Sequence, residues 1–283
     1  MSLTLTIAGH TIRVEGDPEA EILSRSECFA PFVTERQPEW RIRFVDSIEW
    51  PEYQPLHTFY YDETVLCRFG RSGGSYLFEM DGAGSTLRLR CQPGVPVECS
   101  RCCDSGMLRF GVWMAYSLCG MGCDTLPIHA STILWGGKAV LFLGESGTGK
   151  STHTRLWISH IEGSSLLNDD SPILTIEQGR AMVYGSPWSG KTPCYRPFGV
   201  PVAAIVRLRQ APANHIERLS TIRSIAALCP SLPPALAHDE EGFDCQMSLI
   251  EKVIGQVPIY QLDCLPDEEA AQLSHHTIFH PSL

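Results

Sequence analysis

Eight residues in the middle of the chain, GESGTGKS at positions 144–151, restrict its fold more than any other feature of the sequence. They fit the pattern G-x4-G-K-[S/T], in which glycines let backbone amides curl around phosphate oxygens without a Cβ in the way. An apolar segment, Ala139–Leu143, precedes the loop, and a helix is expected from about Gly149 to His160. A strand, a glycine-rich loop and a helix in this order predict a phosphate site at the positive end of the helix.

Two residues at the end of this loop are expected to carry its ionic chemistry. Lys150 can reach the β- and γ-phosphates of a nucleotide, and Ser151 can ligate Mg²⁺. The predicted cofactors are therefore ATP and Mg²⁺. The residues of the loop expected to contact the nucleotide are Gly144, Glu145, Ser146, Gly147, Thr148, Gly149, Lys150, Ser151 and Thr152.

A pair of aspartates is the next candidate feature. The short apolar strand Ser165–Leu167 ends, after one asparagine, in Asp169 and Asp170. Such a strand often lies beside the strand before the phosphate loop, so that its carboxyl end meets the ligand. One aspartate can then hold Mg²⁺, and Asp170 is expected to do so together with Ser151. The other can accept a proton from an attacking hydroxyl, and both are predicted to be catalytic. The alternative is an exposed Asx turn without a ligand.

A histidine stands at the start of a predicted hairpin. Two apolar strands, Ile128–Trp135 and Lys138–Leu143, are joined by Gly136-Gly137, which is a strong hairpin signal. Pairing of these strands would bring His129 to the rim of the phosphate loop. A lone histidine is often structural, so from the residues alone a role beside the phosphates and a structural role remain equal alternatives.

A second glycine-bearing turn follows the aspartates. Gly185–Lys191 comes after a predicted hairpin strand, and Arg196 lies shortly beyond it. Lys191 and Arg196 would supply positive charge to a transferring phosphoryl group and are the remaining predicted nucleotide contacts. A plain surface loop explains the same residues.

The chain divides into a strand-rich part and a part in which strands alternate with helices. Residues 1–105 predict a small β-rich N-terminal domain of unknown role, and residues 106–283 predict an α/β domain. A helix at Asp104–Gly122 is expected to lead into the second domain. The strands expected in the first part are Ser2–Val14, Trp40–Val45, Thr64–Phe69, Ser75–Met80 and Ser85–Cys91.

Composition limits the partners. Hydrophobic residues make up 43% of the 283 residues and charged residues 19%, which favours a folded protein with a core. The formal net charge of −10 argues against binding to nucleic acid or an anionic membrane surface. No apolar run reaches the roughly 18 residues that a membrane span needs, and no signal peptide is recognised, so a cytoplasmic location is expected. A homo-oligomer is left open.

The twelve cysteines are expected to be reduced thiols. The pairs Cys99-x2-Cys102 and Cys119-x3-Cys123 have spacings that a zinc site can use. The segment between them, Met107–Leu118, predicts an apolar helix that would hold the pairs apart. Ordinary thiols are therefore the preferred interpretation, with zinc as the alternative.

The segment IHASTILWGGKAVLFLGESGTGKSTHTRLW at 128–157, followed by LLNDD at 166–170, resembles the catalytic domain of the HPr kinase/phosphorylase family. The same order of a His-containing strand, a phosphate loop and paired aspartates also resembles ATP-dependent phosphoenolpyruvate carboxykinase. The segment 201–220 resembles the strand and turn that follow in kinase-like relatives. The resemblance implies an α/β P-loop kinase core of the phosphoenolpyruvate carboxykinase and HPr kinase type, with the β-rich domain as an addition.

The resemblance also implies roles for individual residues. Lys150 and Ser151 would hold ATP and Mg²⁺, one of Asp169 and Asp170 would be the catalytic base, and His129 would lie near the phosphates. The Arg-Gly-rich segment of HPr kinases has no close match here, and Tyr184–Lys191 is more similar to the carboxykinases. Carboxykinases are much longer, so neither family's substrate carries over.

The favoured function is an ATP- and Mg²⁺-dependent kinase that transfers the γ-phosphate to a hydroxyl, either a serine of a protein or a small molecule. The partners expected are thus ATP and a hydroxyl-bearing phosphoacceptor. A nucleotide-dependent ATPase or switch uses the same loop and is the main alternative. A carboxykinase-like enzyme and a non-catalytic binding protein are less favoured.

Overall fold

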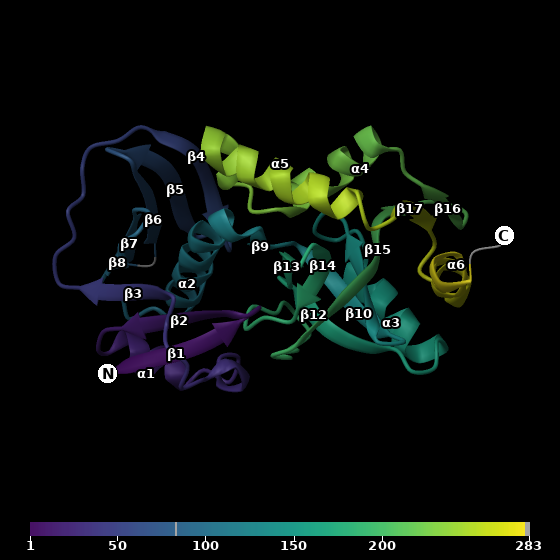
Figure 1. The fold of residues 1–283 in the computed structure, drawn as a ribbon, viewed down its shortest axis with the longest axis horizontal. Coiled ribbons are helices and arrows are strands. Elements are labelled where there is room, and N and C mark those ends of the chain that lie inside the picture. The colour runs from purple at the N-terminus through teal and green to yellow at the C-terminus, as the bar shows by residue number, and fades with distance from the viewer. Residues whose placement is uncertain (83, 281–283) are drawn as a thin grey trace. The chain divides into compact units, whose positions relative to one another are not determined.

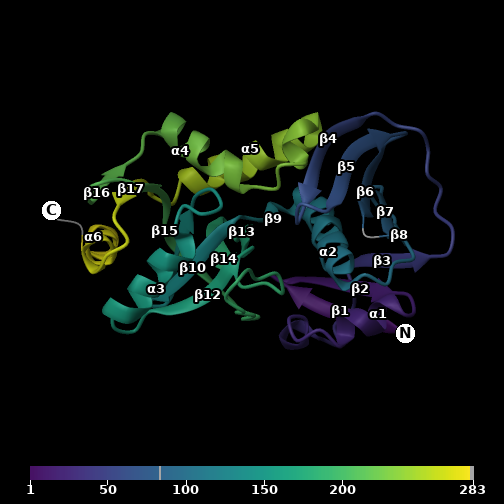
Figure 2. The ribbon, with the colours of Figure 1, turned by 180° about the vertical axis from the view of Figure 1, so that it is seen from behind.

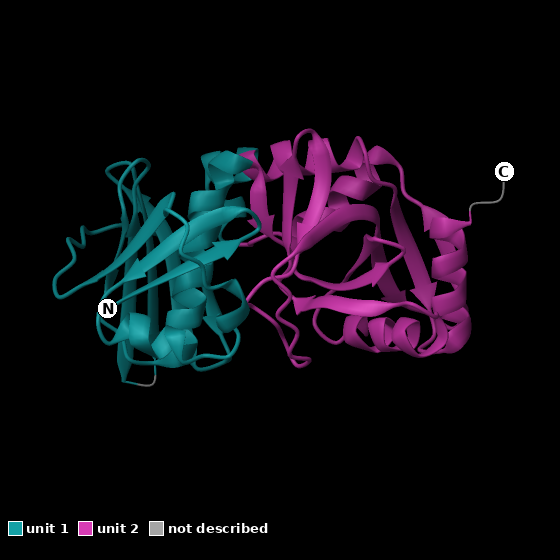
Figure 3. Ribbon diagram, turned by 60° about the horizontal axis from the view of Figure 1, so that its bottom comes forward, with its two compact units in different colours: residues 1–123, 235–244 teal, residues 124–234, 245–283 magenta. Residues whose placement is uncertain are grey.

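A computed structural model describes residues 1–82 and 84–280 and has a mixed α/β fold. The chain forms two compact units, coloured in Figure 3: unit 1 comprises Met1–Cys123 and Ala235–Asp244, and unit 2 comprises Asp124–Pro234 and Cys245–Leu283. This division differs from the expected boundary after residue 105. Helix α2 (Ser105–Gly120) packs on strand β7 (Ser85–Cys91), so the residues expected to lead into the second domain belong to unit 1.

Unit 1 is built on an eight-stranded mixed sheet with the order β1-β2-β3-β8-β7-β6-β5-β4. Most of its strand pairs are antiparallel, whereas β3 pairs in parallel with both β2 and β8. The sheet curls around α2, as Figure 1 shows. The strands are β1 (Ser2–Ile7), β2 (His10–Glu15), β3 (Trp40–Val45), β4 (Pro55–Tyr61), β5 (Val65–Ser72), β6 (Ser75–Gly82), β7 and β8 (Val97–Ser100).

The sequence predicted one strand at Ser2–Val14, and this prediction is wrong. The structure has the hairpin β1–β2 instead, in which Ser2 pairs with Glu15 and Ile7 with His10. Ala8 and Gly9 turn the chain with φ values of 47° and 82°. Alternation of polar and apolar residues continues through such a tight turn, so the pattern alone did not reveal the reversal. The predictions of Trp40–Val45 and Ser85–Cys91 are confirmed to the residue.

Helix α2 fills the inside of this curled sheet. Its N-cap is Asp104, whose carboxylate accepts a hydrogen bond from the Met107 amide at 2.8 Å. Buried residues occur nearly all round the helix, and Leu108, Val112 and Tyr116 are among them. A helix that is apolar on most sides is enclosed by other elements, which is the role that α2 plays in unit 1. A short helix, α1 (Glu19–Ser24), and the 3₁₀ turn η1 (Ala30–Phe32) complete the layer beside β1.

Unit 2 contains a nine-stranded mixed sheet. The path β12-β10-β11-β15-β14-β13-β9 is extended by β17, which pairs in parallel with β15, and by β16, which pairs with β17. Its strands are β9 (Thr125–Pro127), β10 (Ala130–Trp135), β11 (Lys138–Leu143), β12 (Ser165–Asp170), β13 (Ile173–Glu177), β14 (Arg180–Tyr184), β15 (Gly199–Gln210), β16 (His215–Arg218) and β17 (Ile259–Cys264).

The hairpin β10–β11 confirms the sequence prediction. Gly136 and Gly137 both have positive φ, 55° and 74°, which is the backbone of a type I′ turn. Strand β12 is longer than expected and includes Asp169 and Asp170 themselves. It pairs antiparallel with β10 rather than lying directly beside β11. Because β11 and β12 both run antiparallel to β10, they are parallel to each other, and their carboxyl ends still reach the same edge of the sheet.

Four α-helices belong wholly or partly to unit 2: α3 (Lys150–His160), α4 (Thr221–Leu228), α5 (Glu240–Ile254) and α6 (Glu268–Phe279). Helix α3 packs on strands β10 and β12 and on helix α6. Figure 2 shows α3 beside these two strands. Its Trp157 is fully buried in a core cluster with Phe142 and Val206. This packing fixes the helix that begins directly after the glycine-rich loop at 144–149. None of the helices among the described residues is both long and apolar enough to cross a membrane.

Candidate nucleotide and phosphoryl-transfer site

The loop between β11 and α3 is shaped by three glycines. Gly144, Gly147 and Gly149 have φ values of 156°, 81° and 107°, in the range that other residues rarely adopt. A Cβ added at Gly147 or Gly149 would project into open space. Helix α3 begins at Lys150 without a side-chain cap at Gly149 and without an acidic residue in its first turn. The loop therefore offers uncapped backbone amides next to an open cradle, which is what an anion needs.

Lys150 lies across this loop. Its Nζ donates to the carbonyl oxygens of Gly144 at 2.7 Å and of Glu145 at 3.3 Å, and to Nε2 of His129 at 2.8 Å. Burial lowers the pKa of Lys150, while the nearby carboxylates of Asp170, Glu145 and Asp169 act in the opposite direction. Across the described residues no carboxylate lies within ion-pair distance of Nζ. The ammonium is thus half-buried, oriented and without a neutralising contact.

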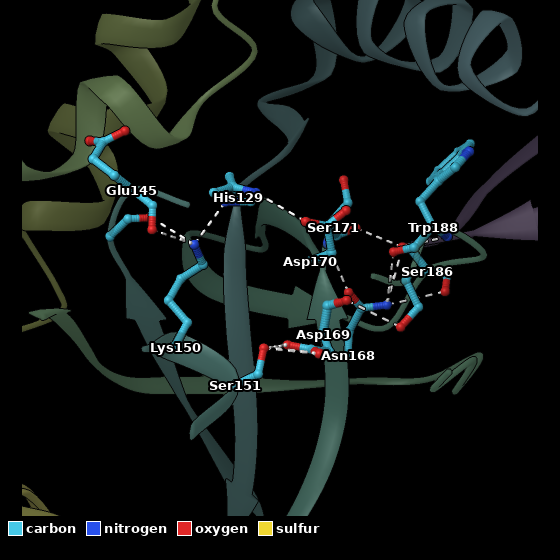
Figure 4. Close-up of polar contacts among 12 residues, drawn as sticks. His129, Glu145, Lys150, Ser151, Asn168, Asp169, Asp170, Ser171, Ser186 and Trp188 are labelled. Atoms are coloured by element: carbon cyan, nitrogen blue, oxygen red, sulfur yellow. Dashed lines mark hydrogen bonds and ion pairs between the residues drawn. The ribbon is translucent and has the colours of Figure 1, made fainter. Parts of the chain in front are cut away.

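His129 connects Lys150 to Asp170, as Figure 4 shows. Its Nδ1 is 3.1 Å from Oδ1 of Asp170. An ammonium can only donate, so Nε2 of a neutral His129 accepts from Lys150 and the ring proton sits on Nδ1, facing Asp170. The main chain at His129 is held by Ser231, whose carbonyl accepts from the His129 amide at 2.6 Å. The histidine expected at the rim of the phosphate loop is located there.

Ser151 pairs with Asp169. Its Oγ donates to Oδ1 of Asp169 at 3.0 Å and is 3.2 Å from Oδ2. Asp169 is buried, at 4% exposure, whereas the Asp170 side chain is 44% exposed. The expected pairing of Ser151 with Asp170 is therefore not the pairing in the structure. Successive side chains of a strand point to opposite faces, which is why two adjacent aspartates acquire different neighbours.

The backbone of Asp170 is strained. Its φ is 131°, an unusual value for a residue with a side chain. Asp170 forms an isolated bridge with Ser189, and Gly190 approaches so closely that an added Cβ would be 3.1 Å from the Asp170 Cβ. Strained residues are held by their surroundings and cluster at functional sites. Here the surroundings are the segment 185–194.

Two residues at the end of β15 also contact the loop, and sequence reasoning missed them. Arg207 Nη2 forms an ion pair with Glu145 at 2.7 Å, and Gln210 Nε2 donates to the carbonyl oxygens of Gly147 and Thr148 at 3.2 and 3.4 Å. Strand β15 is parallel to β11 and its neighbour in the sheet. Polar residues that follow the apolar run at 202–206 were the available signal in the sequence.

A cavity of about 570 Å³ opens beside the phosphate loop within unit 2. Gly147, Thr148 and Gly149 line one side of it. Its other walls are mainly apolar and include Leu156, Leu208, Ala211, Leu265 and Pro266, together with the Gln210 side chain. A largely apolar cavity with a few polar groups next to an open glycine-rich loop has the form of a site for a small organic ligand.

The remaining candidates are placed differently. Lys191 is exposed and directly follows Gly190, whose amide donates to the Asp169 carbonyl oxygen. Arg196 instead reaches Ser165 Oγ at 3.3 Å, at the start of β12. Five residues of extended chain span about 16 Å, so Arg196 is remote from Asp170 and the structure does not bring it to the phosphate loop. Thr152 accepts from Arg155 and also lines the cavity beside the loop, so the structure keeps this candidate at the site.

The cysteine spacings do not produce a metal centre. Within residues 1–82 and 84–280, no group of three or more His, Cys, Asp or Glu side chains is arranged to hold a metal ion. Cys99 and Cys102 are buried in unit 1, and burial raises the pKa of both thiols.

The comparisons with known proteins supply no role for the residues of this site. Neither a scan against models of protein families nor a search of curated proteins finds a match for this chain. The mixed α/β architecture is established by the structure, while the resemblance to HPr kinases and phosphoenolpyruvate carboxykinases stays a hypothesis.

Proposed function

We propose that this protein is a kinase that uses ATP and Mg²⁺ to phosphorylate a hydroxyl group. One observation carries the proposal: two polar groups, the chain Lys150–His129–Asp170 and the pair Ser151–Asp169, converge on one phosphate-type loop. The first offers a cation and a carboxylate that is open to an acceptor. The second offers a hydroxyl and a buried carboxylate. Phosphoryl transfer needs these groups and little else, because it depends on positioning and on charge stabilisation.

The loop is suited to the phosphates of the nucleotide. Uncapped amides at the start of α3, the open faces of Gly147 and Gly149, and the Lys150 ammonium all favour an anion at the same place. Lys150 is held by neutral acceptors only, so it can turn from the loop carbonyls to phosphate oxygens without breaking an ion pair. Its role is to stabilise negative charge on the group being transferred.

Ser151 and Asp169 are the residues suited to a cation bound with the nucleotide. Mg²⁺ in such enzymes takes most of its ligands from phosphates and water and only one or two from the protein. A serine hydroxyl and a carboxylate 3.0 Å apart supply the protein's part. In the proposed assignment Asp169 therefore takes the role that the sequence gave to Asp170.

Asp170 is the proposed base. Its Oδ1 accepts from Nδ1 of His129, which leaves Oδ2 to accept the proton of an incoming hydroxyl. The exposure of this carboxylate makes it accessible to an acceptor, in contrast to Asp169. His129 holds the base in place and links its position to that of Lys150.

The apolar cavity beside the loop is the proposed site of the nucleobase. Leu208 and Leu156 provide apolar walls, and Gln210 provides a polar group next to Gly147. The cavity lies on the Gly147–Gly149 side of the loop, so a base there can remain attached to phosphates in the cradle. This arrangement supports a purine nucleotide as the phosphate donor.

The test is a balance of the γ-phosphate. Purified protein is incubated with Mg²⁺ and γ-labelled ATP, with and without fractionated cell extract as a source of acceptors, and label on acceptor and free phosphate are both counted. We expect acceptor-dependent transfer in the native protein and a fall of about 100- to 10,000-fold for Asp170→Asn, because a general base is lost. ATP binding should change little. Asp124→Asn, which alters an aspartate paired with Lys252 elsewhere in unit 2, is the matched control and should keep its activity.

Each outcome decides between functions. Free phosphate alone, formed at the same rate with or without extract and lost in Asp170→Asn, would establish an ATPase or nucleotide switch in place of a kinase. Absence of ATP–Mg²⁺ binding at millimolar concentration would overturn the proposal altogether.

A further inference from the structure

The segment 185–194 packs against the strand end that carries both aspartates. The Gly190 amide donates to the Asp169 carbonyl oxygen, and Ser189 Oγ is 3.2 Å from that oxygen. Ser189 also forms the isolated bridge with Asp170. The segment therefore forms a wall beside the proposed base, and the exposed Lys191 stands at its tip.

One fully buried side chain of β12, that of Asn168, contacts this wall at several points. Asn168 is fully buried, at 0% exposure. Its Nδ2 lies 3.2 Å from the Ser186 carbonyl oxygen, 3.3 Å from that of Trp188 and 3.4 Å from that of Cys194. Figure 4 shows the amide directed at Ser186 and Trp188. These acceptors come from the beginning, the middle and the end of the segment.

The other atom of the same amide controls the turn after the base. Asn168 Oδ1 accepts from the Ser171 amide at 3.0 Å. Asp170 is thus enclosed between two residues whose positions depend on Asn168: Ser171 along the chain and Ser189 across the bridge. The unusual φ of Asp170 requires such support, because strained backbone persists only where surrounding contacts hold it.

We propose that Asn168 is a positioning residue for phosphoryl transfer, because its amide holds the segment 185–194 and the Ser171 turn on either side of Asp170 and so fixes the reach of that base. The effect on catalysis rests on the proposed function, while the effect on the segment does not. An amide is needed here: the nitrogen faces carbonyl oxygens, whereas the oxygen faces a backbone amide. An aspartate of the same shape would direct an oxygen at those carbonyls and lose the contacts.

Asn168→Asp tests the proposal with two readouts. Transfer is measured as kcat and as KM for ATP, and the segment is followed by hydrogen exchange at the Gly190 amide and by trypsin cleavage after Lys191. We expect kcat to fall about 100-fold, the cost of a misplacement near 1 Å, with KM for ATP changed less than about threefold. Exchange and cleavage should each accelerate at least about tenfold. Gln246→Glu is the matched control, because Gln246 is also a buried amide that donates to a backbone carbonyl, that of Pro233.

Gly190→Ala provides a second test in which Asn168 is intact. The new Cβ would lie 3.1 Å from the Asp170 Cβ and 3.2 Å from the Asp169 carbonyl oxygen, so the base must shift by a few tenths of an ångström. We expect kcat to fall about tenfold with KM for ATP unchanged. This variant keeps the proposal testable if Asn168→Asp does not fold.

The results separate the two proposals. A loosened segment with unchanged kcat would overturn the positioning role, as would an unchanged segment in Asn168→Asp. A native protein that transfers no phosphate would refute the proposed function, and exchange at Gly190 would still report whether Asn168 holds the segment.

Discussion

Two charged regions of this protein, one in the sheet of unit 1 and one at the glycine-rich loop of unit 2, use their charges in opposite ways. In unit 1, Glu79 on β6 accepts from Arg68 on β5 at 2.8 Å and from Arg88 on β7 at 2.7 Å, and the three residues are directly opposite one another in the sheet. Charges in the middle of strands thus neutralise each other across the sheet. In unit 2, Lys150 and the aspartate pair lie at the ends of elements, where Lys150 contacts only neutral acceptors.

This difference teaches how to distinguish structural charges from functional ones. A cross-strand ion pair satisfies its groups and contributes to folding. A cation oriented by carbonyl oxygens at a glycine-rich loop retains a strong attraction for an anion that the chain does not supply. The comparison predicts that substitutions in the cross-strand ion pairs of unit 1 change stability. It also predicts that substitutions at the glycine-rich loop and the aspartate pair of unit 2 change activity.

The largest expected effect is that of Lys150→Met. Removing the cation should lower phosphate transfer about 1,000-fold, because a charge-stabilising group is lost from the transition state. The free energy of unfolding should stay within about 1 kcal/mol of the native value, because no ion pair is broken. Single-turnover transfer and urea unfolding measure the two quantities. Lys138→Met, at the exposed start of β11, is the control and should alter neither. A stability loss comparable to the activity loss would contradict the comparison.

The next effect concerns a buried histidine in unit 2. His153 on α3 is 3% exposed, and burial lowers its pKa from 6.5 to about 4. As the pH falls from 6.5 to 4, the unfolded chain binds a proton before the folded protein does, so stability present above pH 6.5 is lost. The loss should amount to about 3 kcal/mol.

His153→Gln removes this titration but retains an acceptor for Trp157 Nε1, which lies 3.3 Å from His153 Nε2. Its stability should therefore decline less between pH 6.5 and 4 than that of the native protein, as followed by urea unfolding at several pH values. If the unfolding free energy of the two proteins falls equally steeply between pH 6.5 and 4, a group other than His153 controls the pH dependence of stability. His160→Gln, at the end of the same helix, is the control for the loss of a histidine.

The smallest effect is expected for Glu79→Gln in unit 1. The Glu79 side chain is 12% exposed and its two arginine partners are partly solvated, so we expect a loss of about 1–2 kcal/mol in unfolding free energy. Phosphate transfer should be unchanged. Glu98→Gln breaks a longer and more exposed pair with Arg90 and should cost less than about 0.5 kcal/mol. If Glu79→Gln lowers phosphate transfer but leaves the free energy of unfolding unchanged, Glu79 has a functional role and the comparison is contradicted.

Local patterns predicted much of the fold around the site. The strand Lys138–Leu143, the turn at Gly136-Gly137 and the helix ending at His160 agree with the structure, because each depends on periodicity or on glycine within a few residues. Predictions were less accurate where pairing with other strands decides the structure: β12 extends to Asp170 rather than ending at Leu167, and β16 was not predicted at all. A four-residue strand with exposed ends has little signal of its own and exists by pairing with β17.

The sequence by itself determined which groups the candidate site offers: a glycine-rich loop with a lysine and a serine at a helix start, and two aspartates at a strand end. The tertiary structure decided which groups meet. It paired Ser151 with Asp169, connected Lys150 through His129 to Asp170, excluded Arg196, and introduced Arg207, Gln210 and Asn168. These contacts depend on strand order and register, which are set by burial across the whole unit, so no local pattern could specify them.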